Sequence, residues 1–283
     1  MNLKTIIFFT LAITLSGSLS AAERLITIGG CVTESVCQLG NCSDIVAVDV
    51  TSELPGVLPD NLPKLGYFTK LSGEGILSFK PTRMIAIQGS GPEAAISQVR
   101  NSKTTSVHLV NDGYTLKDSL QRIRQVGVAL GKRQAGEKLA SEVEKNVRSL
   151  FQEKRTSVRI LFIYARGARM VMTGGKNTSA DEYIRLIGGT NVISIEGFKP
   201  ISAEAVISAR PDVILIPAGS LFSLAKDKET VMKSLLALPG VAQTPAGKNK
   251  AVVTIDDSLL CGMGPRTPDA VRKARTDIGQ LVK

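Results

Sequence analysis

The chain has no tryptophan, few other aromatic residues and a single histidine, His108, among its 283 residues. One histidine argues against zinc or manganese as a ligand, because sites for these ions draw on several histidine and carboxylate side chains. A Ser-His-Asp triad would have to use this one histidine, and the G-x-S-x-G motif of many serine hydrolases is absent. The G-x-x-x-x-G-K-[ST] motif of nucleotide-binding loops is absent too. Hydrolases and nucleotide hydrolysis are therefore not indicated, and we do not expect an enzyme.

The chain also lacks a dense run of lysine and arginine, although its formal net charge is +10. Because the basic residues are spread along the sequence and no RNA-binding signature occurs, nucleic acid is not an expected partner. An excess of 35 basic over 25 acidic residues favours an anionic ligand or surface. A generally basic protein with no such partner is the alternative interpretation.

Long apolar runs are absent except near the start, from Ile6 to Leu15. This run is shorter than the roughly 20 residues that a membrane-spanning helix needs. Lys4 precedes it, and Ser20 and Ala22 supply small residues before the expected cleavage point, which is typical of a secretory signal peptide over residues 1–22. No cysteine follows for a lipid anchor, so we expect a soluble mature protein in the bacterial periplasm.

Cysteine is scarce, but in an oxidising compartment its four copies predict disulfides. We favour a bond between Cys37 and Cys42, which flank the end of the first expected helix where Gly40 turns the chain. Cys31 and Cys261 come from opposite ends of the sequence, so their pairing and their presence as free thiols both stay open. No C-x-x-C motif occurs, and a metal or redox centre built from these cysteines is not indicated.

One segment occurs twice, as Leu71–Pro81 and as Ile201–Pro211, 130 residues apart. Each copy predicts a helix with a serine N-cap, a glutamate (Glu74 or Glu204) in its first turn, a basic residue near its end and a proline stop before an apolar strand. A repeat at so long a period does not fit a solenoid, so it indicates duplication of a whole lobe. The alternative is that two unrelated helices use the same capping residues.

Strands and helices alternate on both sides of a helical region, which predicts an α/β fold. We expect two similar Rossmann-like lobes with parallel-rich sheets, at residues 23–114 and 157–283, and a ligand cleft between them. Over residues 115–156 apolar positions recur at helical spacing with one break at Gly131, which predicts a long rigid α-helix as the interlobe spine. The first expected helix spans Thr33–Leu39, and the second lobe is expected to open with the strand Arg159–Tyr164.

Tyr67 follows Gly66 on a loop that leads into the first copy of the repeat, so it is expected to project from a cleft wall. A phenolate can bind ferric iron as an axial haem ligand. Because the phenol has an unperturbed pKa of about 10, the anion needs a nearby cation. Arg166, Arg169 and Arg266 lie on loops expected to face the cleft. Packing of Tyr67 against the neighbouring lobe is the alternative.

Several segments together resemble the periplasmic haem-binding proteins of bacterial haem ABC importers, over essentially the whole mature chain. They are Ile26–Glu34, Val46–Asp49 with Thr51 and Ser52, Leu65–Phe68 running into Leu71–Leu77, Asn177–Asp181, the second copy of the repeat, and Gly262–Pro268. The resemblance implies that Tyr67 is the axial ligand of ferric haem b, and that the haem pocket includes Arg166, Arg169, Gly174, Met263 and Arg266. It also implies that Glu74 and Glu204 dock onto the two subunits of an ABC permease.

The chain departs from the family pattern after the first strand of the second lobe. Some members have a histidine there that supports a second haem or a second axial bond, whereas this chain has Tyr164, Ala165 and Arg166. We therefore expect one five-coordinate haem, bound by a monomer and supplied by an outer-membrane haem uptake system. A ferric siderophore or a corrinoid is the alternative cargo, and an exported thiol oxidoreductase is the alternative class.

Overall fold

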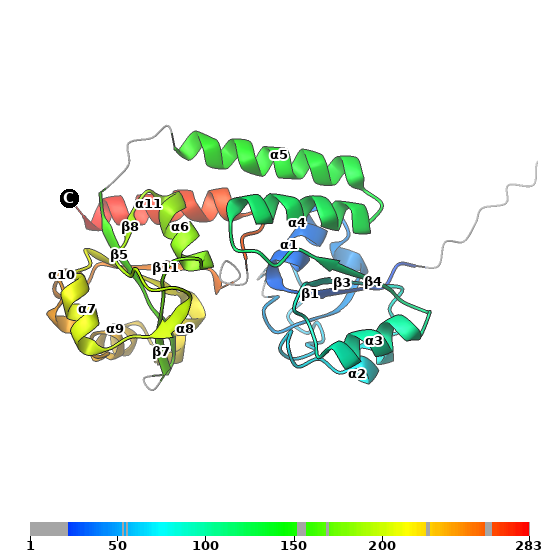
Figure 1. Cartoon of the computed structure of the whole chain (residues 1–283), viewed down its shortest axis with the longest axis horizontal. Coiled ribbons are helices and arrows are strands. Elements are labelled where there is room, and N and C mark those ends of the chain that lie inside the picture. Colours follow the sequence, from blue (N-terminus) through cyan, green and yellow to red (C-terminus); the bar gives the residue numbers. More distant parts are fainter. Residues whose placement is uncertain are drawn as a thin grey trace, which may run out of the picture.

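A computed structural model shows two lobes side by side, with a pair of long helices along one edge (Figure 1). It describes residues 22–52, 54, 56–151, 157–167, 170–224, 227–257 and 262–282, without the side chains of Arg166, Lys228 and Glu229. The expected signal peptide lies outside the described residues except for Ala22. In the described part of the chain, no helix combines the length and apolar character needed to cross a membrane.

The N-terminal lobe is built on a four-stranded parallel sheet in the order β2-β1-β3-β4. Its elements are β1 (Leu25–Ile28), α1 (Gly30–Gln38), β2 (Ile45–Val48), α2 (Gly73–Ser78), β3 (Arg83–Ile87), α3 (Glu93–Asn101) and β4 (Ser106–Val110). Alternate strand residues pack on opposite faces: Leu25 and Ile85 face α1, whereas Ile26 and Met84 face α2 and α3. Both faces of the sheet are thus covered, which explains the continuous apolar runs of its strands.

The C-terminal lobe repeats this topology with a sheet in the order β8-β5-β10-β11, also parallel. Its elements are β5 (Arg159–Phe162), α6 (Ser179–Ile187), β8 (Thr190–Asn191), α7 (Ala203–Ala209), β10 (Val213–Pro217), α8 (Ala218–Leu224), α9 (Lys228–Leu236), α10 (Pro245–Lys248), β11 (Val252–Ile255) and α11 (Thr267–Leu281). In each lobe the duplicated helix, α2 or α7, leads into the third strand of the sheet in that order. The prediction of two similar α/β lobes is confirmed.

The two copies of the repeat have the same local geometry. Ser72 Oγ accepts a hydrogen bond from the Gly75 N–H, and Ser202 Oγ accepts one from the Ala205 N–H. The basic residue before each proline, Lys80 or Arg210, has a left-handed backbone with φ of 48° or 42°. It reverses the chain at the end of the helix, a conformation that an L-residue adopts only at some energetic cost.

An arginine outside the repeat stabilises each helix end in the same way. Arg24 donates hydrogen bonds from its guanidinium to the carbonyls of Phe79 and Lys80. Arg159 does the same to the carbonyls of Ala209 and Arg210. Since the last carbonyls of a helix have no partner within it, these two arginines satisfy equivalent acceptors in the two lobes.

The interlobe region differs from the single long helix that the sequence predicted. It forms two helices, α4 (Leu116–Ala129) and α5 (Arg133–Leu150), and the chain reverses at Gly131, where φ is 72°. The helices pack side by side, and a Cβ on Gly127 would lie only 2.7 Å from the Cα of Gly136. Helix α5, with 18 residues and a length of about 27 Å, extends over both lobes (Figure 1).

Several local expectations were wrong. Helix α1 begins at Gly30 rather than Thr33, because residues after β2 bind its first N–H groups: Asp49 accepts from Gly29 and Thr51 from Gly30. The expected strand Arg159–Tyr164 ends at Phe162. A new strand begins at Tyr164 and belongs to a small antiparallel sheet of β6 (Tyr164–Arg166), β7 (Met170–Gly174) and β9 (Phe198–Pro200).

The Cys37–Cys42 disulfide is confirmed, and it links the end of α1 to the turn before β2. Cys31 is buried at the start of α1. Cys261 lies outside the described residues, so its predicted alternatives stay predictions.

Candidate functional site

A cavity of about 920 Å³ lies between the two lobes. Segments that follow strands of both parallel sheets line it, including Val50 after β2, Asp112 after β4, Gly219 of α8 after β10 and Asp257 after β11. The cavity therefore lies beyond the carboxyl ends of the strands, where ligands bind in open α/β sheets. The loop at Tyr67, which was expected to wall the cleft, lines it, and so does Gly262.

Aromatic residues are concentrated on the walls of this cavity. Tyr67, Phe68 and Tyr114 of the N-terminal side and Tyr164 and Phe198 of the C-terminal side line it, although the chain has only 12 aromatic residues in all. Met172 adds a polarisable thioether on the same wall as Tyr164. A cavity with this much aromatic surface suits a large, flat, apolar ligand.

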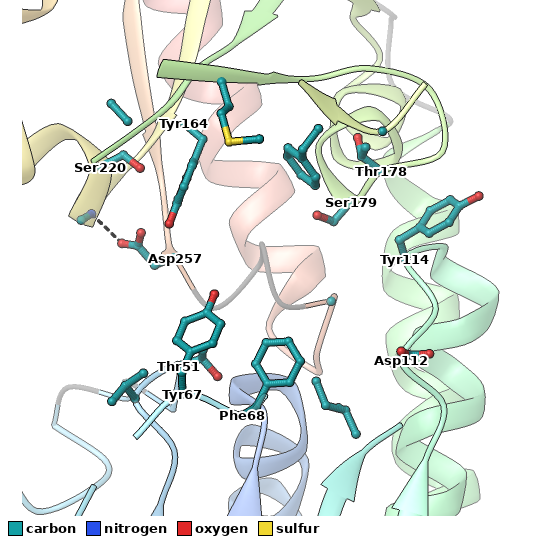
Figure 2. Close-up of a pocket in the computed structure, with 18 of the residues that line it drawn as sticks. Thr51, Tyr67, Phe68, Asp112, Tyr114, Tyr164, Thr178, Ser179, Ser220 and Asp257 are labelled. Atoms are coloured by element: carbon teal, nitrogen blue, oxygen red, sulfur yellow. Dashed lines mark hydrogen bonds between the residues drawn. The ribbon is translucent and has the colours of Figure 1, made fainter. Parts of the chain in front are cut away.

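Tyr67 projects from the N-terminal lobe into the cavity, as the sequence predicted. The loop around it is held by two backbone hydrogen bonds, from Val50 to the Gly66 carbonyl and from Lys70 to the Tyr67 carbonyl, both within 3.0 Å. Gly66 has φ of 92°, a conformation that favours glycine, and the ring of Phe68 packs 5.2 Å from that of Tyr67. The Tyr67 side chain is 37% exposed, and its hydroxyl points away from its own lobe (Figure 2).

Tyr164 is a functional candidate that sequence reasoning missed. It begins β6, where it pairs with Met172 of β7, and it enters the cavity from the C-terminal lobe. Figure 2 shows the hydroxyls of Tyr67 and Tyr164 turned toward one another across the cavity. A signal was present in the sequence, because Tyr164 lies in the stretch Tyr164–Arg166 where the resemblance implied a histidine in some members.

The remaining residues predicted for the ligand pocket lie elsewhere or outside the described part. Gly174 is buried at the end of β7, and Met263 is 1% exposed in the core of the C-terminal lobe. The Arg266 side chain contacts Glu34 and Asp256 and lines a smaller, separate cavity. Arg169 and the side chain of Arg166 are outside the described residues.

The polar groups of the cavity are mainly hydroxyls and carboxylates. Thr51, Thr178, Ser179, Ser220 and Ser223 line it together with Asp112 and Asp257, and no lysine or arginine does so among the side chains that are described. Asp257 accepts a hydrogen bond of 2.6 Å from the Gly219 N–H at the start of α8. The Ser220 Oγ is buried and has no hydrogen-bond partner among the described residues, which leaves it available to a ligand.

Two other features bear on binding. Within the described residues, no group of three or more histidine, cysteine and acidic side chains could hold a metal ion.

Glu74 and Glu204 are exposed in the first turns of α2 and α7, which lie on the edge of the molecule away from α5 (Figure 1). A backbone hydrogen bond at the helix start, and then one with Ser202, lower the pKa of Glu204.

Comparison with known proteins gives a consistent relationship. The family model described as "periplasmic binding protein" matches residues 25–259. A search of curated protein sequences gave no significant match.

Among solved structures, the chain is similar to the apo form of the periplasmic heme-binding protein RhuT from Roseiflexus sp. RS-1, with 35% identity and a TM-score of 0.85 over 93% of this chain and 100% of that one. It is similar to the periplasmic heme-binding protein HutB of Vibrio cholerae, with 34% identity and a TM-score of 0.79 over 90% and 98%. It is also similar to the periplasmic heme-binding protein BhuT in complex with two hemes, with 30% identity and a TM-score of 0.80 over 92% and 99%. The fold, the interlobe cavity and these matches agree, and the chain belongs to the periplasmic binding protein family.

Proposed function

We propose that this protein captures ferric haem between its two lobes and delivers it to an ABC permease. The observation that carries the proposal is the position of Tyr67 in an aromatic cavity. The similarity to three periplasmic heme-binding proteins supports the same cargo. A signal peptide would place the protein in the periplasm, where an outer-membrane uptake system supplies the haem and the protein acts as a monomer.

Tyr67 is the proposed axial ligand. On binding, its phenol loses a proton, and the phenolate oxygen bonds to the ferric iron. The rings of Phe68, Tyr114 and Phe198 then cover the apolar faces of the porphyrin. Arg166 and Arg169 keep the role expected of them, as cations near the phenolate or the haem propionates. Gly174, Met263 and Arg266 would support the wall of the cavity without touching the haem.

Tyr164 is a second candidate ligand, and its position supports this role. Because it enters from the lobe opposite Tyr67, it could bind the other face of one haem or the outer face of a second. The one-haem expectation was based on the absence of a histidine at this position. A tyrosine can also ligate ferric iron, so the titration must measure whether each protein molecule binds one haem or two.

Glu74 and Glu204 are the proposed docking groups. Each lies in the first turn of a duplicated helix, so the two lobes present the same charge to a permease with two similar subunits. An exposed ion pair contributes only about 0–1 kcal/mol, so two such contacts would orient the complex more than hold it together.

The test is an absorption titration with ferric haem of the wild type, Tyr67→Phe, Tyr164→Phe and, as a matched control, Tyr114→Phe. Wild type should give a saturable Soret shift with a tyrosinate charge-transfer band. Tyr67→Phe should lose that band and at least 100-fold in affinity, equivalent to about 2.7 kcal/mol, and Tyr114→Phe should bind nearly normally. No specific shift with the wild type would reject haem as the cargo and favour a ferric siderophore or a corrinoid.

A further inference from the structure

Residues Gly262–Arg266, which directly precede α11, contact two buried charged side chains, Glu34 of α1 and Arg122 of α4. Glu34 is 3% exposed and Arg122 is 1% exposed. We call Glu34, Arg122 and the loop Gly262–Arg266 the interlobe latch.

Arg122, on α4, joins this loop to the segment that precedes α4. Its Nη2 donates to the Met263 carbonyl at 3.1 Å, and its Nη1 donates to the carbonyls of Asn111 and Gly113. The hydroxyl of Ser119, on the same helix, also donates to the Met263 carbonyl, at 2.7 Å. One buried guanidinium therefore binds backbone from both lobes, and its burial is tolerated because these carbonyls accept hydrogen bonds from it.

Glu34 holds the other end of the loop. Its carboxylate accepts a hydrogen bond from the backbone N–H of Arg266, and its Oε2 lies 3.4 Å from the Arg266 Nε. The Arg266 Nη1 also lies 3.2 Å from Oδ2 of Asp256, which follows β11. A single arginine thus connects the sheet of its own lobe to α1 of the other. Burial raises the pKa of Glu34, and the nearby Arg266 opposes that rise.

The two glycines of the loop fit these charged groups closely. A Cβ on Gly262 would lie 2.7 Å from Arg122 Nη2, and one on Gly264 would lie 2.7 Å from Glu34 Oε2. Gly262 also has φ of 101°, a conformation that other residues rarely adopt. The sequence Gly-Met-Gly-Pro-Arg therefore needs its glycines so that backbone and buried charge can come into contact.

The latch adjoins the ligand site on both sides. Gly262 and Thr51 both line the main cavity. Thr51 also accepts a hydrogen bond from the Gly30 N–H, at the start of the helix that carries Glu34. Tyr67 and Tyr164 come from different lobes, so the gap between them depends on how the lobes are held. Any shift of Gly262–Arg266 relative to α1 would change that gap.

We propose that Glu34 and Arg122 are positioning residues that fix the C-terminal lobe against the N-terminal lobe and so set the width of the ligand cavity. The proposal rests on the proposed function for the identity of the ligand, but its structural half concerns the ligand-free protein. Neither side chain touches the ligand. They act through the loop Gly262–Arg266 on the relative position of the two cavity walls.

The test compares Glu34→Ala, Glu34→Gln and Gly264→Ala with the wild type, and uses Glu137→Gln as the control. Glu137 is an exposed carboxylate that pairs with Arg124 within the spine, so it does not connect the lobes. Small-angle scattering of the ligand-free proteins measures the lobe arrangement, circular dichroism checks the fold, and a ferric haem titration measures binding.

Glu34→Ala and Gly264→Ala should increase the radius of gyration and weaken haem binding at least tenfold, whereas Glu34→Gln, which keeps an acceptor for Arg266, should restore most of both. Scattering identical to that of the wild type for a folded Glu34→Ala or Gly264→Ala protein would overturn the proposal, whatever happened to haem binding. Should Glu34→Ala fail to fold, Gly264→Ala alone decides. If the wild type does not bind haem, the proposed function fails while the scattering comparison still tests the latch.

Discussion

The two lobes share a scaffold but differ in the walls they offer to the ligand. Both have four parallel strands in the same order, a duplicated helix with a serine cap, and an arginine that binds the carbonyls at that helix end. In the N-terminal lobe, β1 passes directly into α1 through Gly29, whereas in the C-terminal lobe the β6-β7 hairpin separates β5 from α6. The lobes are alike where they build their cores and differ where they face the cavity.

Equivalent positions in the two lobes supply different residues to the cavity. The loop before α2 carries Tyr67, whereas the segment before α7 supplies Phe198 of β9 to the opposite wall. Tyr164 comes from the hairpin that has no counterpart in the first lobe. The two facing tyrosines are therefore not related by the duplication, although they meet across one cavity.

The largest expected effect tests the equivalence of the two cores. Ile85 in β3 and Leu215 in β10 occupy matching places in the two sheets, 130 residues apart, and both are fully buried. Ile85→Ala and Leu215→Ala should each lower the free energy of unfolding by about 2–5 kcal/mol, because each leaves a cavity that the sheet cannot fill. Urea unfolding measures the free energy of unfolding of both variants. A negligible loss in only one of them would show that the two positions are not equivalent.

A smaller effect tests the paired helix ends. Arg24→Met and Arg159→Met should each lower the free energy of unfolding by about 1 kcal/mol, because carbonyls of Phe79 or Ala209 lose a charged donor while water still reaches them. Thermal and urea unfolding would be compared with Arg148→Met, whose exposed guanidinium pairs with Glu144 of the same helix, α5. A loss confined to one of the two arginines would show that the lobes do not use this contact equally.

Substitution of Glu74 and Glu204 tests whether both lobes take part in docking to the permease. Glu74→Arg and Glu204→Arg should each reduce haem uptake by cells, since each replaces a carboxylate proposed to dock onto the permease with a positive charge. The double variant should abolish uptake, while haem binding by the purified protein stays unchanged because neither residue lines the cavity. Normal uptake by the double variant would remove the docking proposal.

The smallest effect concerns the titration of Glu34, which only the N-terminal lobe possesses. Burial raises the pKa of this carboxyl, so the folded protein holds its proton to a higher pH than the unfolded chain does. Its contribution to stability is therefore largest below the ordinary glutamate pKa and declines as pH rises toward the raised value. Unfolding measured from pH 4 upward should show this decline in the wild type and not in Glu34→Gln; parallel curves would contradict it.

Much of the fold could be predicted because its signals are local. Apolar runs, serine caps and the Lys-Pro and Arg-Pro stops mark the strands and helices of both copies of the repeat. The reversal at Gly131 was missed because the spacing of apolar residues is the same in one long helix as in two helices that fold back. The start of α1 at Gly30 was missed because its partners, Asp49 and Thr51, come from the next strand's loop.

The cavity was predictable only in part, for a physical reason of the same kind. Tyr67 could be identified because it follows a glycine on a loop that leads into the first copy of the repeat. Arg266 was placed at the ligand because loop position indicates which side of a lobe a residue is on, but not which partner its charge will meet. Buried Glu34 decides that partner, and it comes from 232 positions earlier in the chain.

The sequence by itself indicated the two α/β lobes, favoured the Cys37–Cys42 bond and placed Tyr67 on a loop, since each of these predictions used patterns within short segments. Only the tertiary structure decided that Tyr164 faces Tyr67, that the helical region folds into a hairpin, and that Arg266 binds Glu34 instead of lining the main cavity. These features depend on contacts between segments that are far apart in the chain, and such contacts leave no periodic trace in the sequence.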